Sequence, residues 1–269
     1  MTAVASRSLG CLPPPVLRPF VDRLWFYEST HPHPYDIILP SGDLQLLVSL
    51  EEPAEGLPHA IWTGPMTKPV RVSTAAMRRI VGVCFRPGGA RPFLGRPATE
   101  LTNLDVGISE LWGRDGEVLY DRLMACRDPQ SILTELGRVL LERFDQRDPP
   151  EPGFEAALRG LAKGGRVTQM ADALGWSVAT MRRRFHDRLG LSPKQHASLV
   201  RFQRAVRALA RGQDNLADVA LGAGYFDQAH LTHDFGRYAG CSPGAYRPRD
   251  PTEPNHVDPE RFLQSQTLG

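Results

Sequence analysis

The 269-residue sequence has few cysteines and no long hydrophobic run, and these absences exclude several classes of protein. Its four cysteines are scattered singly, with no CxxC pair. This pattern argues against a disulfide framework and a cysteine-based zinc site, and it favours the reducing cytoplasm. No apolar stretch approaches the ~20 residues of a membrane crossing, and the first residues lack the features of an export signal. We therefore expect a cytoplasmic protein without a membrane partner.

The sequence also lacks recognisable arrangements of catalytic residues. It contains no P-loop, no Ser-His-Asp arrangement and no dinucleotide fingerprint. His31, His33 and His59 lie in proline-rich loops rather than in an HxH motif on a strand, so surface histidines are favoured over metal ligands. We expect no enzymatic activity, no cofactor and no metal site. The sequence assigns no ligand-binding residues.

Positive charge is concentrated in one part of the chain, although the net charge is only +2. Residues 1–150 have a net charge of −2, residues 151–250 of +6 and residues 251–269 of −2. In the middle segment, 13 of the 15 basic residues are arginine. A basic segment joined to a mildly acidic one favours a polyanionic partner for the basic half.

Turn residues and hydrophobic periodicity divide the chain into a β-rich part and a helical part. Between about residues 18 and 100, short apolar runs alternate with Pro-Ser-Gly, Gly-Pro and Pro-Gly-Gly turns, which predicts a β-sandwich or small barrel. Between about 113 and 144 the period is helical. The broad apolar stripe of this segment consists of Ile132, Leu133, Leu136, Val139, Leu140 and Phe144. Two interpretations of the stripe remain open, namely packing onto the β-rich part and dimerisation.

These features predict an α+β chain with a β-rich N-terminal barrel or sandwich, trailing helices and an all-α C-terminal domain. Trp25, Phe26, Trp62 and Phe85 are candidates to line a ligand pocket, although buried core positions are commoner for such residues. The expected boundaries are a flexible arm (1–14), a β-rich sensor domain (15–112), a helical, candidate dimerisation region (113–144), a linker (145–152), the all-α domain (153–248) and a disordered tail (249–269).

Two stretches of the all-α part are copies of one unit. They are "GWSVATMRRRFHDRLGLSP" and "GYFDQAHLTHDFGRYAGCSP", about 50 residues apart. Aligning Phe185 with Phe235 also aligns an apolar residue four positions earlier, a glycine five positions later and a Ser-Pro pair, and the second turn has one extra residue. Each unit has a short helix, a glycine turn and a second helix. This is the pattern of a helix-turn-helix, whose second helix enters a major groove of DNA.

Helical geometry separates the three consecutive arginines, 182–184. At about 100° per residue, with Met181 and Phe185 buried, Arg183 points outward, Arg182 lies near it and Arg184 falls on the opposite flank. Arg184 is thus suited to a phosphate or an intramolecular carboxylate. The residues expected to contact DNA are Ala179, Thr180, Arg182, Arg183, His186, Gln228, Ala229, His230, Thr232, His233 and Arg237. Solvated faces of a small helical domain are the alternative, which the duplication and the basic bias oppose.

The C-terminal hundred residues resemble the DNA-binding domain of the AraC/XylS family of bacterial transcription regulators. The stretches "MADALGWSVATMRRRFHDRLGLSPKQHASLVRFQRAVRAL" and "LADVALGAGYFDQAHLTHDFGRYAGCSPGAYR" carry this resemblance. It implies two helix-turn-helix units joined by a long helix, 193–211, and held about one DNA turn apart. The base-reading positions that it implies are Ala179, Arg182, Arg183, Gln228, Ala229, Thr232 and His233. Asp234 departs from the family pattern. Since a carboxylate facing phosphates weakens binding, we expect the first unit to contribute more of the affinity.

Residues 15–112 resemble, more loosely, the β-rich domain that precedes this module in some family members. The stretches "ILPSGDLQLLVSL", "WTGPMTKPV" and "VGVCFRPGGARPFLGRPATEL" carry this resemblance, which implies a cupin-like barrel for ligand sensing or dimerisation. We therefore expect a sequence-specific DNA-binding transcriptional regulator that responds to an effector. Its expected partners are double-stranded DNA, a second copy of the chain, RNA polymerase and a small-molecule effector. Two alternatives remain open: a DNA-binding regulator without an effector, and metal-dependent cupin-type enzyme activity in the N-terminal domain.

Overall fold

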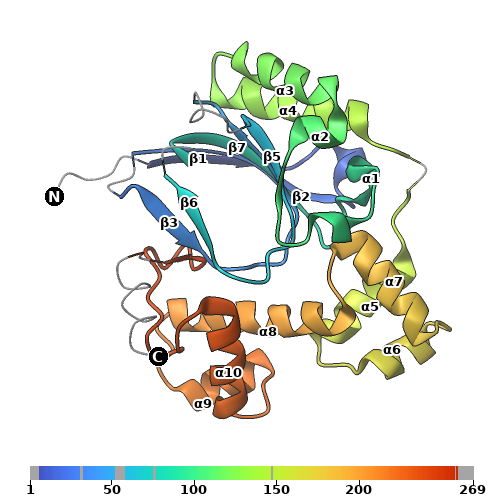
Figure 1. Cartoon of the computed structure of the whole chain (residues 1–269), viewed down its shortest axis with the longest axis vertical. Coiled ribbons are helices and arrows are strands. Elements are labelled where there is room, and N and C mark those ends of the chain that lie inside the picture. The colour runs from blue at the N-terminus through green and yellow to red at the C-terminus, as the bar shows by residue number, and fades with distance from the viewer. Residues whose placement is uncertain are drawn as a thin grey trace.

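The computed structural model describes residues 6–30, 33–51, 58–74, 77–146, 148–257 and 259. Two β-sheets with helices against one of them occupy the first half of the chain, and the second half is helical (Figure 1). The prediction of a mixed α+β fold is confirmed, whereas the cupin-like detail stays a prediction. None of the helices in the described ranges combines the length and the apolar composition that a membrane crossing requires.

All strand pairings of the two sheets are antiparallel. The larger sheet has the order β1-β2-β7-β4-β5-β8, and the smaller sheet has the order β6-β3-β9. The strands are β1 (Ser6–Cys11), β2 (Val21–Ser29), β3 (Tyr35–Ile38), β4 (Gln45–Ser49), β5 (Ala60–Thr63), β6 (Val70–Ser73), β7 (Arg79–Phe85), β8 (Asp105–Gly107) and β9 (His256–Val257). The smaller sheet therefore joins strands from the two ends of the chain.

One face of the larger sheet contributes the main hydrophobic core, which lies beneath helices. Phe26 on β2 is paired with Val81 on β7, and both side chains are at most 1% exposed. Helices α3 (Arg114–Met124) and α4 (Pro129–Arg143) cover this face (Figure 1). Asp128 caps α4 by accepting hydrogen bonds from the backbone N–H groups of residues 130 and 131. The apolar stripe of α4 packs into the same core, so the structure favours packing over dimerisation for this face.

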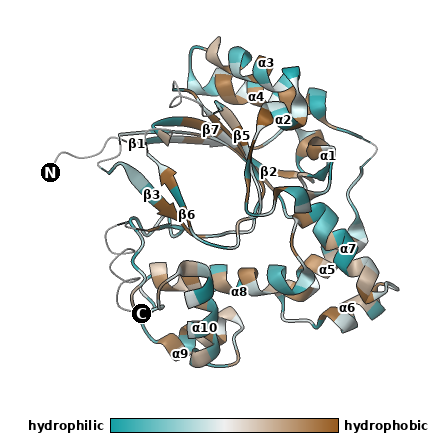
Figure 2. Cartoon of the chain, in the orientation of Figure 1, coloured by the Kyte–Doolittle hydropathy of each residue, from teal (hydrophilic) through white to brown (hydrophobic). Residues whose placement is uncertain are grey.

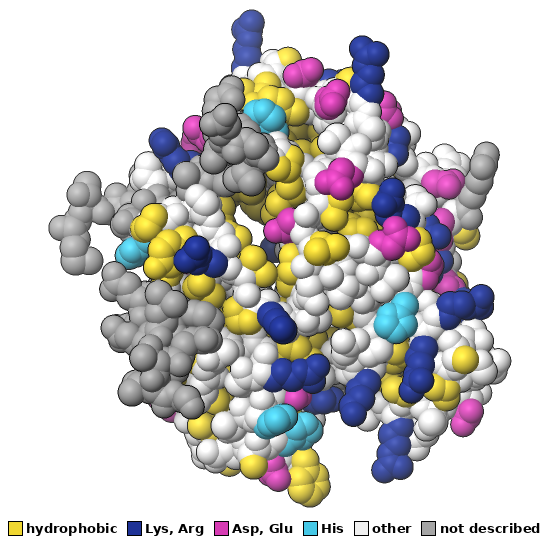
Figure 3. Space-filling model, in the orientation of Figure 1, with side chains coloured by type: hydrophobic (Ala, Val, Ile, Leu, Met, Phe, Trp, Pro, Cys, Tyr) yellow, Lys and Arg dark blue, Asp and Glu magenta, His cyan; other side chains and the backbone are white. Residues whose placement is uncertain are grey.

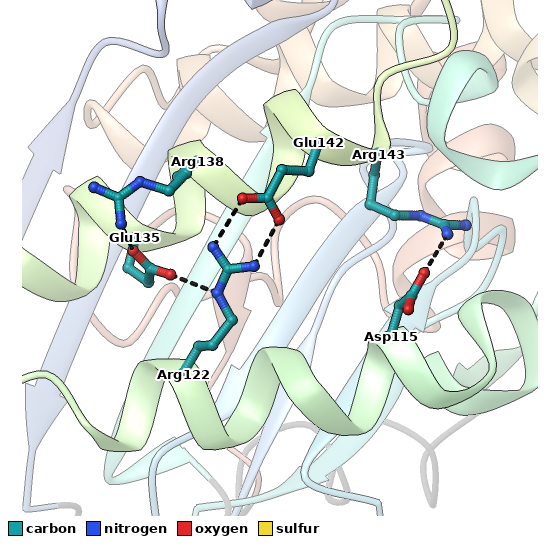
Figure 4. A network of polar contacts seen from close by, with 6 residues as sticks. All are labelled: Asp115, Arg122, Glu135, Arg138, Glu142 and Arg143. Carbon is teal, nitrogen blue, oxygen red and sulfur yellow. Dashed lines mark hydrogen bonds and ion pairs between the residues drawn. The ribbon is translucent and has the colours of Figure 1, made fainter.

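The outer surfaces of α3 and α4 are joined by ion pairs (Figure 4). The Arg122 guanidinium lies 2.5 Å from Glu135 and 2.6 Å from Glu142, and Arg143 lies 2.8 Å from Asp115. The carboxylates hold the pKa of Arg122 above its usual range, and Arg122 in turn lowers the pKa of Glu142. The side of the helix pair that bears these ion pairs is strongly polar. The helices therefore turn their apolar side towards the sheet.

Both expected disordered ends contain regular structure. Residues 6–11 of the expected flexible arm form β1, which pairs with β2 along its whole length. Residues 256 and 257 of the expected disordered tail form β9, which pairs with β3. These two expectations were wrong for the described residues because backbone pairing with a distant strand stabilises segments that have little periodicity of their own. Residues 1–5, 258 and 260–269 lie outside the described part.

The second half of the chain has its own hydrophobic core. Its helices are α5 (Pro152–Ala162), α6 (Val167–Ala173), α7 (Val178–Leu189), α8 (Pro193–Ala210), α9 (Leu216–Ala223) and α10 (Gln228–Ala239). Helix α8 crosses the region, with α5, α6 and α7 at one end and α9 and α10 at the other (Figure 1). Much of the surface of α7 is hydrophilic, while hydrophobic residues concentrate on the inner faces of the helices (Figure 2). Phe185, Phe202 and Phe235 are completely buried in this core.

Gly190 and Gly175 provide a matched test of the contact between the two halves. Both have positive φ angles, +70° and +65°. A Cβ at Gly190 would lie 2.7 Å from the carbonyl oxygen of Ala98, whereas a Cβ at Gly175 would meet nothing within 4 Å. Gly175→Ala should cost about 1 kcal/mol from backbone strain alone. We expect Gly190→Ala to cost a further 1–3 kcal/mol, roughly, from overpacking, as measured by urea unfolding. Equal losses for the two variants would show that the Gly190 contact does not constrain the fold.

Candidate nucleic-acid interface

Two helix-turn-helix units flank α8 and share the same local signals. In the first unit, α6 and α7, the Ser177 side chain accepts a hydrogen bond from the backbone N–H of Thr180. In the second, α9 and α10, Asp227 caps the helix in the same way. Both second helices end at a glycine with φ of +70°, which favours residues without a Cβ. Matching caps at both ends give the two recognition helices, α7 and α10, twelve residues each.

The arginines of the first recognition helix point in different directions, as the helical geometry predicts. Arg182 and Arg183 are exposed, while Met181 and Phe185 are completely buried. Arg184 is half-buried and makes an ion pair with Glu151, and its guanidinium lies 4.4 Å from the ring centroid of Trp176. Of the two partners that the sequence allowed for Arg184, the structure contains the intramolecular carboxylate. Among the residues that the structure describes, Arg182 and Arg183 make no such ion pair.

The remaining predicted contact residues lie on the outer surfaces of the two recognition helices. Leu231 and Phe235 bury the inner side of α10. The exposed predicted residues are Ala179, Arg182, Arg183, His186, Gln228, Ala229, His230, Thr232, His233 and Arg237, and Thr180 is half-buried. Basic side chains gather over α7 and the adjoining end of α8 in Figure 3. DNA contact by these residues stays a prediction.

Asp234 does not face the outside, which removes the reason for expecting a weaker second unit. Its side chain is buried, accepts a hydrogen bond of 2.7 Å from the Ser198 hydroxyl and lies 3.8 Å from Arg201. Both partners are on α8. The carboxylate therefore fixes α10 to the central helix, and it does not line the outer surface predicted to contact DNA.

The N-terminal half holds the C-terminal end of α7. The Thr102 hydroxyl donates a 2.7 Å hydrogen bond to the carbonyl oxygen of Gly190, the last-turn cap of α7. Arg91 lies 3.1 Å from Asp187 and 3.9 Å from Asp148, and Asp148 also lies 2.7 Å from Arg188. The expected linker, 145–152, thus contains a carboxylate that joins arginines from both halves of the chain.

A second set of contacts joins the C-terminal tail to the smaller sheet, and no sequence pattern predicts it. Asp36 on β3 is 1% exposed, and its carboxylate lies 3.2 Å from Arg249 and 2.6 Å from His256. The Gln203 amide on α8 donates hydrogen bonds to the carbonyl oxygen of Pro40 (2.8 Å) and to the side chain of Asn255 (3.0 Å). We call the segment 247–257 with these contacts the tail clasp. It fixes the central helix, the tail and the smaller sheet to one another.

Two neighbouring rows of side chains on the second face of the larger sheet are half-buried or exposed, unlike the core side chains of the first face. Strand register places five polar residues in one row across β2, β7, β4, β5 and β8, which we call the polar row. These residues are Arg23, Cys84, Gln45, Thr63 and Asp105. The next row, the apolar row, contains Trp25, Gly82, Leu47 and Ile61. A Cβ at Gly82 would lie 2.5 Å from the Trp25 ring, so the indole lies across the glycine.

Two carboxylates, one in the polar row and one near it, are desolvated by the surrounding protein. Asp43 and Asp105 are both exposed, yet surrounding protein desolvates their carboxylates, which raises the pKa of Asp43 to about 6 and also raises the pKa of Asp105. Figure 3 shows a hollow near the middle of the molecule, bordered by hydrophobic side chains. Burial likewise raises the pKa of the Cys84 thiol.

The candidate pocket aromatics are divided between the two faces. Phe26, Trp62 and Phe85 belong to the buried core, where the rings of Trp62 and Phe85 stack with centroids 5.0 Å apart. Only Trp25, of these four, lies on the half-buried face. Among residues in the described ranges, no group of three or more His, Cys, Asp or Glu side chains is placed to hold a metal ion. His59 instead stacks on Tyr120, and His31 lies outside the described residues.

Two family models match separate parts of the chain. A model described as a helix-turn-helix domain matches residues 170–249, and one described as "Domain of unknown function (DUF6597)" matches residues 10–107. A structure of ToxT from Vibrio cholerae aligns with 90% of this chain and 96% of its own, with a TM-score of 0.41 and 8% identity. A structure of ToxT bound to an unsaturated fatty acid aligns with 90% and 94%, with a TM-score of 0.36 and 13% identity.

Curated relatives match over a short region. The HTH-type transcriptional regulator MtrA of Neisseria gonorrhoeae is 33% identical over 81 residues, which are 30% of this chain and 27% of that protein. A putative AraC-like transcription regulator of Streptomyces antibioticus is 32% identical over 89 residues, 33% of this chain and 29% of that protein. The chain thus spans less than a third of the length of these two relatives. Over its C-terminal helix-turn-helix segment, the chain is therefore similar to HTH-type transcription regulators, one of which is described as AraC-like.

Proposed function

We propose that this chain is a sequence-specific DNA-binding transcriptional regulator that reads two successive major grooves with α7 and α10. The observation that carries the proposal is the pair of capped recognition helices whose outer faces are exposed while their inner faces are fully buried. Helix α8 has 18 residues, a length of about 27 Å. This length is close to the ~34 Å between successive major grooves on one side of DNA.

Selection from random double-stranded DNA tests the proposal directly. We expect the full-length chain to enrich a motif with two half-sites about 10 base pairs apart, centre to centre. Affinity for the selected DNA should fall steeply as salt rises, because each arginine–phosphate contact releases counterions. A selected pool without a motif, bound no more tightly than random DNA, would overturn the proposal. If a motif is selected, mapping of bound DNA in the source organism would identify the promoters. A homodimer and a contact with RNA polymerase stay predictions.

The polar and apolar rows support a second element of the proposal, a small-molecule effector bound on this face of the larger sheet. Half-buried hydrogen-bonding groups beside Trp25, Leu47 and Ile61 provide both polar and apolar contacts, as ligand sites do. Asp43, beside the polar row, lies one residue from Gly42, where a Cβ would be 2.3 Å from the Leu199 side chain on α8. A ligand that moves this loop would therefore act on the helix that spaces the two recognition helices.

Thermal-shift screening of the full-length chain against metabolites tests the effector proposal. A binding metabolite should raise the melting temperature of the wild type. Gln45→Ala, in the polar row, should abolish the shift, while Gln169→Ala, exposed on α6, should retain it. Absence of any shift would favour the regulator without an effector. A shift caused by a transition metal alone would favour the metal-dependent alternative.

A further inference from the structure

The extra residue in the second helix-turn-helix turn is an outward-facing phenylalanine. The caps Ser177 and Asp227 occupy equivalent positions, but one residue separates Gly175 from its cap and two separate Gly224 from its cap. Trp176 and Tyr225 are the first aromatic residues of the two turns, so Phe226 has no counterpart in the first unit. Its side chain is 90% exposed, the greatest exposure among the described large hydrophobic side chains.

The fold fixes the outward direction of Phe226 through its two neighbours. Tyr225 is 3% exposed, with its ring 5.1 Å from that of His230 and 5.5 Å from the Arg201 guanidinium, measured to the ring centroid. On the other side, Asp227 caps α10 by accepting a 2.7 Å hydrogen bond from the His230 backbone N–H. With one neighbour anchored in the core and the other bound to the helix, the residue between them must face solvent.

Phe226 stands at the end of α10 that would lead into a major groove. The N-terminal residues of a recognition helix are those that contact base edges. Gln228 and Ala229, in the first turn of α10, are exposed on the same end. The major-groove edge of thymine carries a methyl group, the one apolar group that a base presents there, and phenylalanine is among the side chains that contact it.

We propose that Phe226 is a specificity residue that recognises a thymine methyl group in the half-site of the second unit, an inference that rests on the proposed DNA-binding function. The first unit, which has no residue at this position, makes no such contact at its entry to the groove. The two half-sites therefore differ in sequence requirement at the base pair next to the recognition-helix N-terminus.

Replacement of single thymines by deoxyuridine, which lacks the methyl group, tests this inference on the selected DNA site. We expect one replacement in the second half-site to weaken wild-type binding by about three- to tenfold, the range expected for loss of one buried methyl group. Phe226→Ala should weaken binding to the thymine site by a similar factor. The wild type and Phe226→Ala should bind the deoxyuridine site equally. Without the thymine methyl group, the phenylalanine ring has no partner to lose.

Leu221→Ala is the matched control. Leu221 is also a highly exposed apolar residue of the second unit, 76% exposed, but it lies on α9. This variant should retain the full difference in affinity between the thymine site and the deoxyuridine site. Circular dichroism should be unchanged for both variants, since neither side chain is buried.

The results separate this inference from the proposed function. Suppose that the wild type selects a motif, and that Phe226→Ala shows the wild-type ratio of affinities for thymine and deoxyuridine at every position. The inference is then overturned, while the proposed function stands. Loss of transcription with unchanged DNA binding would overturn it equally, because Phe226 would then contact a protein. If the wild type selects no motif, the proposed function itself fails.

Discussion

The double variant Arg182→Ala/Arg183→Ala is expected to bind the selected DNA about 2–4 kcal/mol more weakly, a loss of roughly 30- to 1,000-fold in affinity. Both side chains are exposed on the outer face of α7, and each arginine contact with a base or phosphate contributes on the order of 1–3 kcal/mol. Fluorescence anisotropy at a fixed salt concentration measures the loss. A repeated selection should show relaxed base preference in the half-site of the first unit.

Two controls separate this effect from a general loss of charge. Arg114→Ala/Arg127→Ala removes the same charge from exposed positions in the N-terminal half and should change affinity little. Arg184→Ala removes the third arginine of the triplet, which is bound to Glu151 and packed on Trp176. It should lower stability and leave base preference unchanged. If Arg184→Ala changed base preference while the double variant did not, the assigned orientation of α7 would be wrong.

Asp36→Asn is expected to destabilise the folded chain by about 2–4 kcal/mol. The side chain is 1% exposed and has two basic partners, Arg249 and His256, which retain 23% and 26% of their side-chain exposure. Removing one member of a buried ion pair leaves the other charges without compensation, at a cost of roughly 3–5 kcal/mol when the pair is fully buried. We expect a smaller value here because the partners are partly solvated. Urea unfolding followed by fluorescence measures it.

Glu100→Gln provides the comparison for Asp36→Asn. Glu100 pairs with Arg96 at 3.5 Å, and both side chains are at least 44% exposed. Exposed pairs of this kind contribute no more than about 1 kcal/mol. Limited proteolysis should also release the tail of Asp36→Asn faster than that of Glu100→Gln. Similar stability and similar cleavage rates in the two variants would exclude a structural role for the tail clasp.

The outer face of α7 could be predicted from the sequence because helix geometry is local. Met181 and Phe185 are four residues apart, and their burial alone determines where Arg182, Arg183 and Arg184 point. The same reasoning placed Leu231 and Phe235 correctly on the inner side of α10. Duplication strengthened the prediction, because two copies of one pattern are less ambiguous than one.

Contacts between distant parts of the chain could not be predicted in this way. Asp36 and His256 are 220 positions apart, and neither belongs to a periodic segment that would show its partner. Asp234 was expected to face DNA because it is charged, but Ser198 and Arg201 on a different helix turn it inward. The polar row was missed for a related reason, since it exists only once the register of five strands is known.

The tail clasp has a consequence for building chimeric proteins from this chain. In the sequence, residues 247–257 follow the helix-turn-helix domain. Their strand nevertheless pairs with β3, and the side chains of Arg249 and His256 contact Asp36. A fusion that exchanges everything before residue 150 would leave Arg249 and His256 without their carboxylate and would leave β9 without its neighbour. A recombinant with a foreign N-terminal half should therefore keep its folded arrangement only when the donor of that half also supplies the tail.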